Sequence, residues 1–183
     1  MRIPCSKITF KVIFIIAINI IFQLNTVAQG KSDLPIPRFV SIKSNEINLR
    51  SGPGNSYAIK FIYKFKNYPL EVIAEFGHWR LVKDNDGSQG WVHQSLLSGS
   101  RYALIKDNKL TEKELKFQDL KNQAIIFRLP DEISHPILMA EIGVVAKIKK
   151  CLEYWCQIEL EKKCGWIKKI NLWGVYEHEL FDK

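Results

Sequence analysis

The chain carries the same short pattern twice. A tryptophan that opens an apolar stretch is followed by a Gly-Trp pair and then by a leucine two residues before a glycine, at nearly constant spacing. The matched segments are 77–82, 90–92 and 97–99 in the first copy, and 153–158, 165–167 and 172–174 in the second. Repetition at fixed spacing indicates a duplicated structural unit. We therefore expect two small β modules that pack on each other, because each alone would bury little of its surface.

The first 28 residues have the parts of a secretory signal peptide. A basic segment (1–11) precedes an apolar run (12–24), and small residues lead up to Ala28. The apolar run is shorter than the roughly 20 residues that a membrane-spanning helix needs, so export with cleavage is favoured over a retained anchor. Cys5 precedes this run, whereas a lipid-attachment cysteine would follow it. We expect a periplasmic or secreted protein that begins at Gln29 and has no stable membrane span.

The repeats divide the remaining sequence. The expected units are a first module (34–99), a connecting segment (100–123), a second module (124–176) and a C-terminal tail (177–183). The connecting segment opens with residues typical of a strand (101–105) and continues through a charged stretch. There Thr111 and Glu114 match a helix capping box, so a helical turn and a solvated linker both fit.

Two segments of the first module are rich in turn-forming residues. Residues 51–56 read Ser-Gly-Pro-Gly-Asn-Ser and predict an irregular loop after a short alternating strand. Residues 85–88 read Asn-Asp-Gly-Ser and predict a tight hairpin turn.

The loops of the second module are degraded. With 126–128 aligned on 48–50, Leu-Pro-Asp-Glu at 129–132 replaces the glycine-containing loop. If Gly52 or Gly54 has a positive φ, the second loop cannot adopt the same backbone conformation. The two modules therefore need not bind the same ligand.

The cysteines test the alignment of the repeats. When the opening tryptophans are superposed, the aligned positions are Glu75 with Cys151, and Arg80 with Cys156. Each pair brackets a short hairpin connection, so opposite charges in one copy and two cysteines in the other occupy the same cross-strand sites. Because export permits disulfides, we predict a Cys151–Cys156 bridge, with Cys164 left over.

Zinc is the alternative use of these cysteines. Cys164 would supply a third sulfur, but His135 and His178 lack the spacing of a zinc site. We expect no metal.

Several segments resemble the bacterial SH3-like domain family of exported envelope proteins. They are 48–54 (Asn-Leu-Arg-Ser-Gly-Pro-Gly), 72–76, Trp79, 90–99, 155–156, 165–166 and 172–176. The resemblance covers 34–176 and is most specific in the first module. It implies an all-β fold of two tandem SH3-like β-barrels, with about five strands each, packed together after the signal peptide. It also implies non-covalent binding, which in related modules is often of cell-wall peptides.

The candidate ligand groove lies in the first module. It combines aromatic residues, one cation and the two loop glycines, namely Arg50, Gly52, Gly54, Tyr57, Tyr63, Trp79 and Trp91. For the tryptophans, including Trp155 and Trp166, core filling is the commoner use of an aromatic residue in an alternating strand. Since the second module has lost the glycines of this loop, we expect binding to be polarised towards the first.

The residues favour a binding module over an enzyme. Cell-wall cysteine peptidases and amidases, which SH3-like domains often accompany, need a nucleophile, a base within reach and a group that orients the base. Here the repeats occupy nearly the whole mature chain, Cys164 has no histidine near it in sequence, and His78 and His93 lack an obvious nucleophile. We expect no catalytic residue and no cofactor. The expected partner is a cell-wall peptide or an envelope protein, and a hydrolase or its accessory is the less favoured reading.

Charge supplies another class of function. The chain has a formal net charge of +8, and lysines crowd the second module at 147, 149–150, 162–163 and 168–169. A basic patch there would bind anionic wall polymer or a membrane surface, whereas export argues against nucleic acid. The commoner role of such lysines is to keep strand edges soluble.

Overall fold

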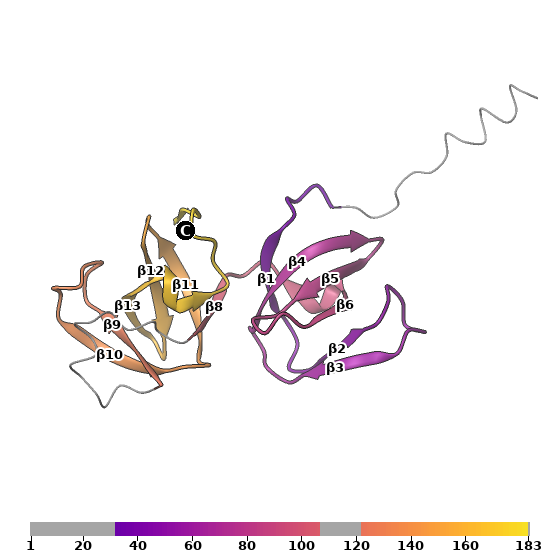
Figure 1. Cartoon of the computed structure of the whole chain (residues 1–183), viewed down its shortest axis with the longest axis horizontal. Coiled ribbons are helices and arrows are strands. Elements are labelled where there is room, and N and C mark those ends of the chain that lie inside the picture. The colour runs from indigo at the N-terminus through magenta and orange to yellow at the C-terminus, as the bar shows by residue number, and fades with distance from the viewer. Residues whose placement is uncertain (1–31, 107–121, 183) are drawn as a thin grey trace, which may run out of the picture.

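The computed structural model describes residues 32–106 and 122–182, which form two antiparallel sheets, one for each repeat (Figure 1). The expected signal peptide, the mature terminus at Gln29 and the capping box at Thr111 lie outside the described residues. Within the described ranges, no helix has the length and apolar character needed to cross a bilayer. The expected all-β fold with two repeated units is confirmed.

The first sheet is built from the first repeat. Its strands are β1 (Arg38–Ile42), β2 (Ile47–Arg50), β3 (Ile59–Tyr63), β4 (Pro69–Phe76), β5 (Trp79–Lys83), β6 (Gln89–His93) and β7 (Leu97–Ser98). A short 3-10 helix, η1 (Gln94–Leu96), joins the last two strands. The predicted turn at 85–88 connects β5 to β6, and Asp84 organises it by accepting hydrogen bonds from the backbone N–H groups of Asp86 and Ser88.

The second sheet repeats this arrangement. Its strands are β8 (Tyr102–Ile105), β9 (Gln123–Phe127), β10 (Pro136–Glu141), β11 (Val145–Cys151), β12 (Trp155–Leu160), β13 (Lys163–Lys168), β14 (Leu172–Trp173) and β15 (Phe181–Asp182). A 3-10 helix, η3 (Lys169–Asn171), precedes β14. Strand β8 comes from the segment expected to connect the modules, and β15 comes from the expected tail, where it pairs with β11.

The strand orders match position by position. The first sheet runs β3-β2-β6-β5-β4-β1-β7, and the second runs β10-β9-β13-β12-β11-β8-β14. Each path has seven strands where about five were expected. In the first sheet β1 and β7 are added to the five strands β2–β6, and in the second sheet β8 and β14 are added to the five strands β9–β13. Among the described residues, no ladder closes either path into a complete barrel.

The register corrects one detail of the alignment. Trp91 pairs with Arg50 in the first sheet, and Trp166 pairs with Phe127 in the second. Phe127 therefore takes the place of Arg50, whereas the sequence alignment gave that place to Arg128. The alignment was wrong by one residue because the second loop has no glycine to mark where the strand ends.

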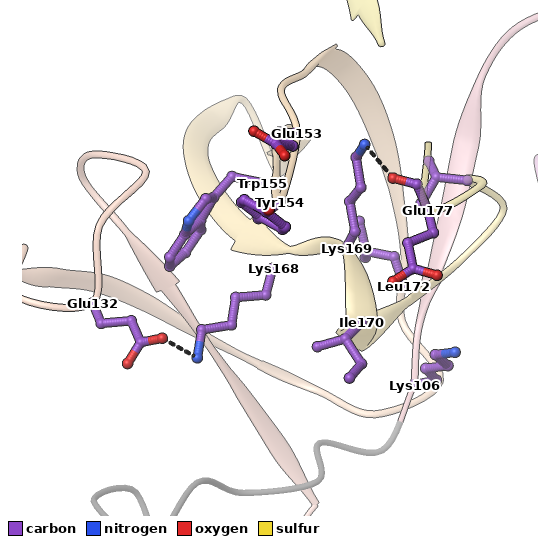
Figure 2. Close-up of a pocket in the computed structure, with 11 residues that line it drawn as sticks. Lys106, Glu132, Glu153, Tyr154, Trp155, Lys168, Lys169, Ile170, Leu172 and Glu177 are labelled. Carbon is purple, nitrogen blue, oxygen red and sulfur yellow. Dashed lines mark hydrogen bonds and ion pairs between the residues drawn. The ribbon is translucent and has the colours of Figure 1, made fainter. Parts of the chain in front are cut away.

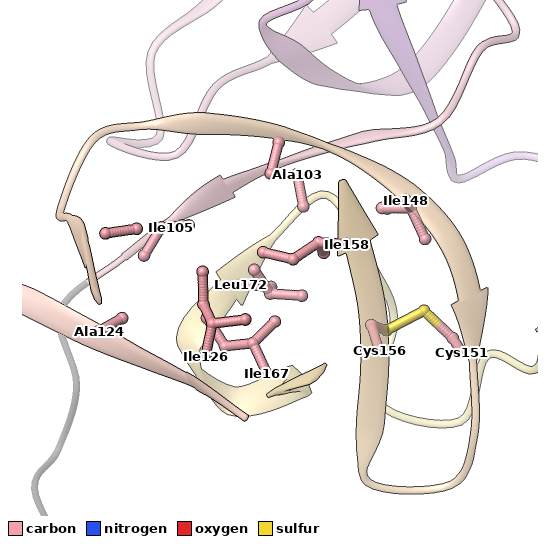
Figure 3. Close-up of a cluster of buried hydrophobic side chains, with 12 residues drawn as sticks. Ala103, Ile105, Ala124, Ile126, Ile148, Cys151, Cys156, Ile158, Ile167 and Leu172 are labelled. Atoms are coloured by element: carbon pink, nitrogen blue, oxygen red, sulfur yellow. A yellow bond between two sulfur atoms is a disulfide. The ribbon is translucent and has the colours of Figure 1, made fainter. Parts of the chain in front are cut away.

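Alternating strand residues fill a separate core in each module. The first core contains Ile42, Ile47, Leu49, Leu70, Val72, Val82 and Val92. The second gathers mainly isoleucines and alanines, with the disulfide at its edge, as Figure 3 shows.

The glycine of each Gly-Trp pair allows neighbouring strands to approach closely. A Cβ atom on Gly90 would lie 2.7 Å from Cβ of Leu49, and one on Gly165 would lie 2.4 Å from Cγ2 of Ile126. Because a larger residue would collide at both positions, this part of the repeated motif is explained by packing.

The predicted disulfide is confirmed. Cys151 and Cys156 face each other on β11 and β12, with their Cα atoms 4.0 Å apart, and their sulfurs are bonded. At the equivalent positions of the first sheet, Glu75 faces Arg80, and Nε of Arg80 lies 3.0 Å from Oε1 of Glu75. Cys164 is unbridged and exposed. The same cross-strand site thus holds an ion pair in one repeat and a covalent bond in the other.

Reduction of the disulfide is expected to lower the free energy of unfolding by about 2 kcal/mol, because the bridge constrains a short loop of the unfolded chain. Urea unfolding of the oxidised and reduced protein measures the difference, with Cys164→Ser as the matched control that should leave it unchanged. Non-reducing peptide maps dominated by a bridge to Cys164 would show that the register is wrong.

The two modules pack against each other, as expected. Phe39 of β1 lies edge-on to Trp173, with ring centroids 5.2 Å apart, and contacts Tyr176 at 4.7 Å. The Tyr176 hydroxyl donates a 3.0 Å hydrogen bond to Glu71, which also pairs with Lys83. Burial, followed by the contact with Glu71, raises the pKa of Tyr176, so the hydroxyl stays protonated and remains a donor. Apolar and polar contacts thus join the repeats.

Candidate functional site

The tryptophans of the first module lie on the outer face of its sheet. Arg80 and Val92 are buried, and their neighbours on β5 and β6 alternate outwards. Trp79 faces His93 across the strands, while Trp91 pairs with Arg50 on its other side. Both tryptophans are half-buried, and so are Trp155 and Trp166 in the second module. The expectation that these residues fill the core was therefore wrong, because small aliphatic residues supply it.

A shallow pocket opens on this outer face. It has a volume of about 190 Å³, and its lining includes Arg50, Trp79 and His93 together with the polar side chains of Asn48 and Asn55. The rings of Trp79 and His93 meet edge-to-face with centroids 5.5 Å apart. An aromatic wall beside a cation and two amides is suited to non-covalent binding of a polar, partly apolar ligand.

Gly52, Gly54 and Tyr57 form a packed loop beside this pocket. The Tyr57 ring covers both glycines, so that a Cβ atom on Gly52 would lie 2.3 Å from its Cδ1 atom and one on Gly54 would lie 3.2 Å from Cδ2. Neither glycine has a positive φ. The loop therefore needs glycine to seat the tyrosine ring, and the space expected for a ligand backbone beside Gly52 is occupied. Arg50 fixes the loop by donating a 2.8 Å hydrogen bond to the Tyr57 carbonyl oxygen.

Tyr63 and Trp91 lie away from the pocket lining. Tyr63 donates to the Asp84 carboxylate at the hairpin turn, and its ring packs against Tyr68. Burial and the neighbouring Asp84 raise the pKa of Tyr63, which keeps it a donor. Trp91 shares the outer face and pairs with Arg50 of the lining, but it does not itself line the pocket. The structure thus brings Arg50 and Trp79 together and leaves the other predicted residues around them.

A larger pocket lies at the equivalent place in the second module (Figure 2). Its volume is about 630 Å³. It is lined by Lys106, Glu132, Glu153, Tyr154, Trp155, Lys168, Lys169, Ile170, Leu172, Val175 and Glu177. Trp155 pairs with Lys168 across β12 and β13 as Trp79 pairs with His93. This pocket was not predicted, because the loop at 129–132 lacks the glycines of the first module. The matching repeat positions of Trp155 and Trp79 were the signal available in the sequence.

The lysines of the second module are partly neutralised. Nζ of Lys149 lies 2.7 Å from Glu159, that of Lys150 lies 2.8 Å from Asp182, and Lys168 is 2.6 Å from Glu132. The hydrogen bond and charge of Glu159 raise the pKa of Lys149. These ion pairs weaken the case for a continuous basic patch.

Residues 32–106 and 122–182 contain no group of three or more His, Cys, Asp or Glu side chains placed to hold a metal ion. The histidines of the first module are bonded to neighbouring side chains. Nδ1 of His93 lies 2.7 Å from the Ser95 hydroxyl, and Nδ1 of His78 lies 3.0 Å from the Gln94 amide. Both contacts hold η1 against β5 and β6.

The comparisons with known proteins place both repeats in one family model. The model described as "Bacterial SH3 domain" matches residues 43–99 and 121–174, which is more than half of the chain. Over 88 residues, the chain is 34% identical to the protein named "Putative N-acetylmuramoyl-L-alanine amidase YrvJ" of Bacillus subtilis (strain 168). That match covers 48% of this chain and 15% of the relative, so the chain spans only a small part of that protein.

Two solved structures are also similar. NlpC1 from Trichomonas vaginalis is 10% identical, with a TM-score of 0.30, and the match covers 81% of this chain and 49% of that one. An NlpC/P60 family protein from Bacillus cereus is 12% identical, with a TM-score of 0.31, and the match covers 74% and 56%.

Proposed function

We propose that this chain, which belongs to the bacterial SH3 domain family, is a non-catalytic binding module that works at the cell wall, outside the cytoplasm. The observation that carries the proposal is the pocket on the outer face of the first sheet, where Trp79, His93 and Arg50 converge. Such a site offers contact area and hydrogen bonds rather than a nucleophile with its base. Its ligand is a cell-wall peptide or an envelope protein.

The cell-wall assignment is supported by the relative from Bacillus subtilis, whose name describes an amidase acting on N-acetylmuramoyl-L-alanine. The amide bond in N-acetylmuramoyl-L-alanine joins a sugar of the cell wall to an amino acid. Because the match spans 15% of the relative, its named activity is not transferred to this chain. A role for the shared segment in holding this chain to the cell wall is consistent with that name.

Within the first module, the predicted residues take different parts. Arg50 and Trp79 contact the ligand, and Tyr57 supports the adjoining loop from its seat on Gly52 and Gly54. Trp91 and Tyr63 stabilise the surrounding sheet and hairpin.

Trp79→Ala is expected to weaken binding to purified peptidoglycan by about 1–3 kcal/mol, the usual loss for an aromatic residue at the centre of an interface. Co-sedimentation isotherms measure the change. Phe65→Ala is the matched control, since Phe65 is an exposed aromatic residue outside the pocket lining and should bind like wild type. Circular dichroism confirms that both variants are folded.

The alternative, adhesion through the lysines of the second module, predicts another pattern. Charge reversal at Lys149 and Lys150 would then abolish binding, high salt would do the same, and Trp79→Ala would have no effect. That combination would replace the pocket proposal with charge-driven adhesion. Retention by an envelope protein extract, with no retention by peptidoglycan, would make the ligand a protein.

A further inference from the structure

We propose that the last residues of the chain complete a second ligand site, which takes a short peptide carrying both a free carboxylate and a free ammonium group. The C-terminal strap, residues 174–182, crosses the second module beside the large pocket. This site is distinct from the pocket around Trp79, and it can bind whether or not that pocket does.

One buried cation and one partly buried cation hold the strap in place. Nζ of Lys169, a residue only 6% exposed, donates to the backbone oxygens of Glu177 at 3.0 Å and Glu179 at 2.6 Å. Arg101 donates to the Gly174 carbonyl oxygen at 2.7 Å and makes two contacts with the Glu179 carboxylate. A buried lysine and a forked arginine that satisfy these acceptors fix the strap far better than solvent-exposed contacts would. The strap is therefore held at fixed positions on the module and can form one wall of the pocket.

The strap makes the second pocket different from the first. Val175 and Glu177 contribute to the lining of the 630 Å³ pocket, and Figure 2 shows Glu177 meeting Lys169. In the first module, the chain after β7 passes directly into β8, so no equivalent wall exists and the pocket measures about 190 Å³. Gln94 stands where Lys169 stands and bonds instead to Arg80. The strap thus enlarges in the second module a pocket that both modules share.

The lining combines apolar walls with both signs of charge. Trp155, Ile170 and Leu172 supply the apolar contact area, and three lysines face three glutamates around them. Lys168 is paired with Glu132. Glu153 and Glu177 are exposed and make no salt bridge within the described ranges. A balanced set of charges disfavours a polyanion or a simple cation, because either would meet repulsion as well as attraction. A zwitterionic peptide meets both signs favourably.

The size of the pocket agrees with such a ligand. Its volume falls within the range of about 300–1,000 Å³ that is usual for small-molecule sites. The carboxylate of the peptide would face Lys106, and its ammonium group would face Glu153 and Glu177.

Isothermal titration of the chain from Gln29 onwards with the tripeptide Ala-Leu-Ala, whose only charged groups are its terminal ammonium and carboxylate, tests the proposal. We expect saturable binding by the peptide with free termini, and at least about tenfold weaker binding by the same peptide with acetylated and amidated ends. Glu153→Lys with Glu177→Lys should also weaken binding at least about tenfold. Glu141→Lys, which reverses an exposed charge on β10 outside the pocket lining, is the control and should bind like wild type.

The strap itself is tested by Glu179→Ala, which removes the partner of Arg101 without altering a lining residue. We expect weakened tripeptide binding with an unchanged fold by circular dichroism. If this variant fails to fold, the charge reversals at the exposed Glu153 and Glu177 decide the matter. Equal affinity of the reversed and wild-type proteins, or no tripeptide binding by wild type, would overturn the second site. Binding to peptidoglycan that still depends on Trp79 would then leave the proposed function standing.

Discussion

Glu75→Gln is expected to lower the free energy of unfolding at neutral pH by about 3–5 kcal/mol, the usual cost of breaking a buried ion pair. The Glu75 carboxylate is fully buried and lies 2.6 Å from Arg38 and 3.0 Å from Arg80. It also accepts hydrogen bonds from the backbone and hydroxyl of Ser32. The amide would leave two guanidinium groups without a counter-charge. Urea unfolding followed by tryptophan fluorescence measures the loss.

The effect of Glu75 should depend on pH. Burial alone would raise the pKa of Glu75, but the hydrogen bonds from Ser32 and Arg38 and the charge of Arg80 outweigh it and lower the pKa from 4.5 to about 2. A carboxyl with a lowered pKa contributes stability above its unfolded pKa and loses it as the pH falls through the folded value. The gap between wild type and Glu75→Gln should therefore be full above pH 4.5 and shrink towards pH 2.

The control for this prediction is Glu46→Gln. Glu46 forms an exposed pair with Lys64 at 3.7 Å, and such pairs contribute at most about 1 kcal/mol. A Glu75 variant that is no less stable than the Glu46 variant would contradict the assigned role of the buried network.

Phe39→Ala is expected to cost about 3–5 kcal/mol and to uncouple the two modules. Phe39 is 6% exposed and fills the contact with Trp173 and Tyr176, so its removal opens a cavity between the sheets. Differential scanning calorimetry should show one transition in wild type and two in the variant. Phe76→Ala is the matched control, since Phe76 is an aromatic strand residue that is 65% exposed. A single transition at the wild-type temperature in Phe39→Ala would contradict the coupling.

The repeated elements could be predicted from sequence because each has a local cause. The Gly-Trp motif follows from a close approach of strands, and the hairpin turn follows from its own residues. The disulfide could be predicted because alignment of the tryptophans places Cys151 and Cys156 at the positions of Glu75 and Arg80. These positions face each other across a hairpin in both modules.

The remaining features depend on contacts between distant segments. Whether the Trp79 side chain points into the core or outwards depends on whether aliphatic residues from other strands fill the core. The local sequence pattern does not reveal this. The large pocket depends on the strap, whose anchors Lys169 and Arg101 lie far apart in the sequence. Gly52 and Gly54 were predicted as groove residues for the space they leave, but their role in seating the Tyr57 ring is visible only in the folded loop.

Co-sedimentation of the chain from Gln29 onwards with intact, purified peptidoglycan is the most direct measurement, with the pellet assayed for protein and the supernatant for released wall fragments. We expect saturable binding in the pellet, reduced by Trp79→Ala, and no release of fragments on prolonged incubation. Protein that remains in the supernatant at every concentration would contradict a wall-binding function, and soluble fragments that accumulate with time would contradict a non-catalytic one.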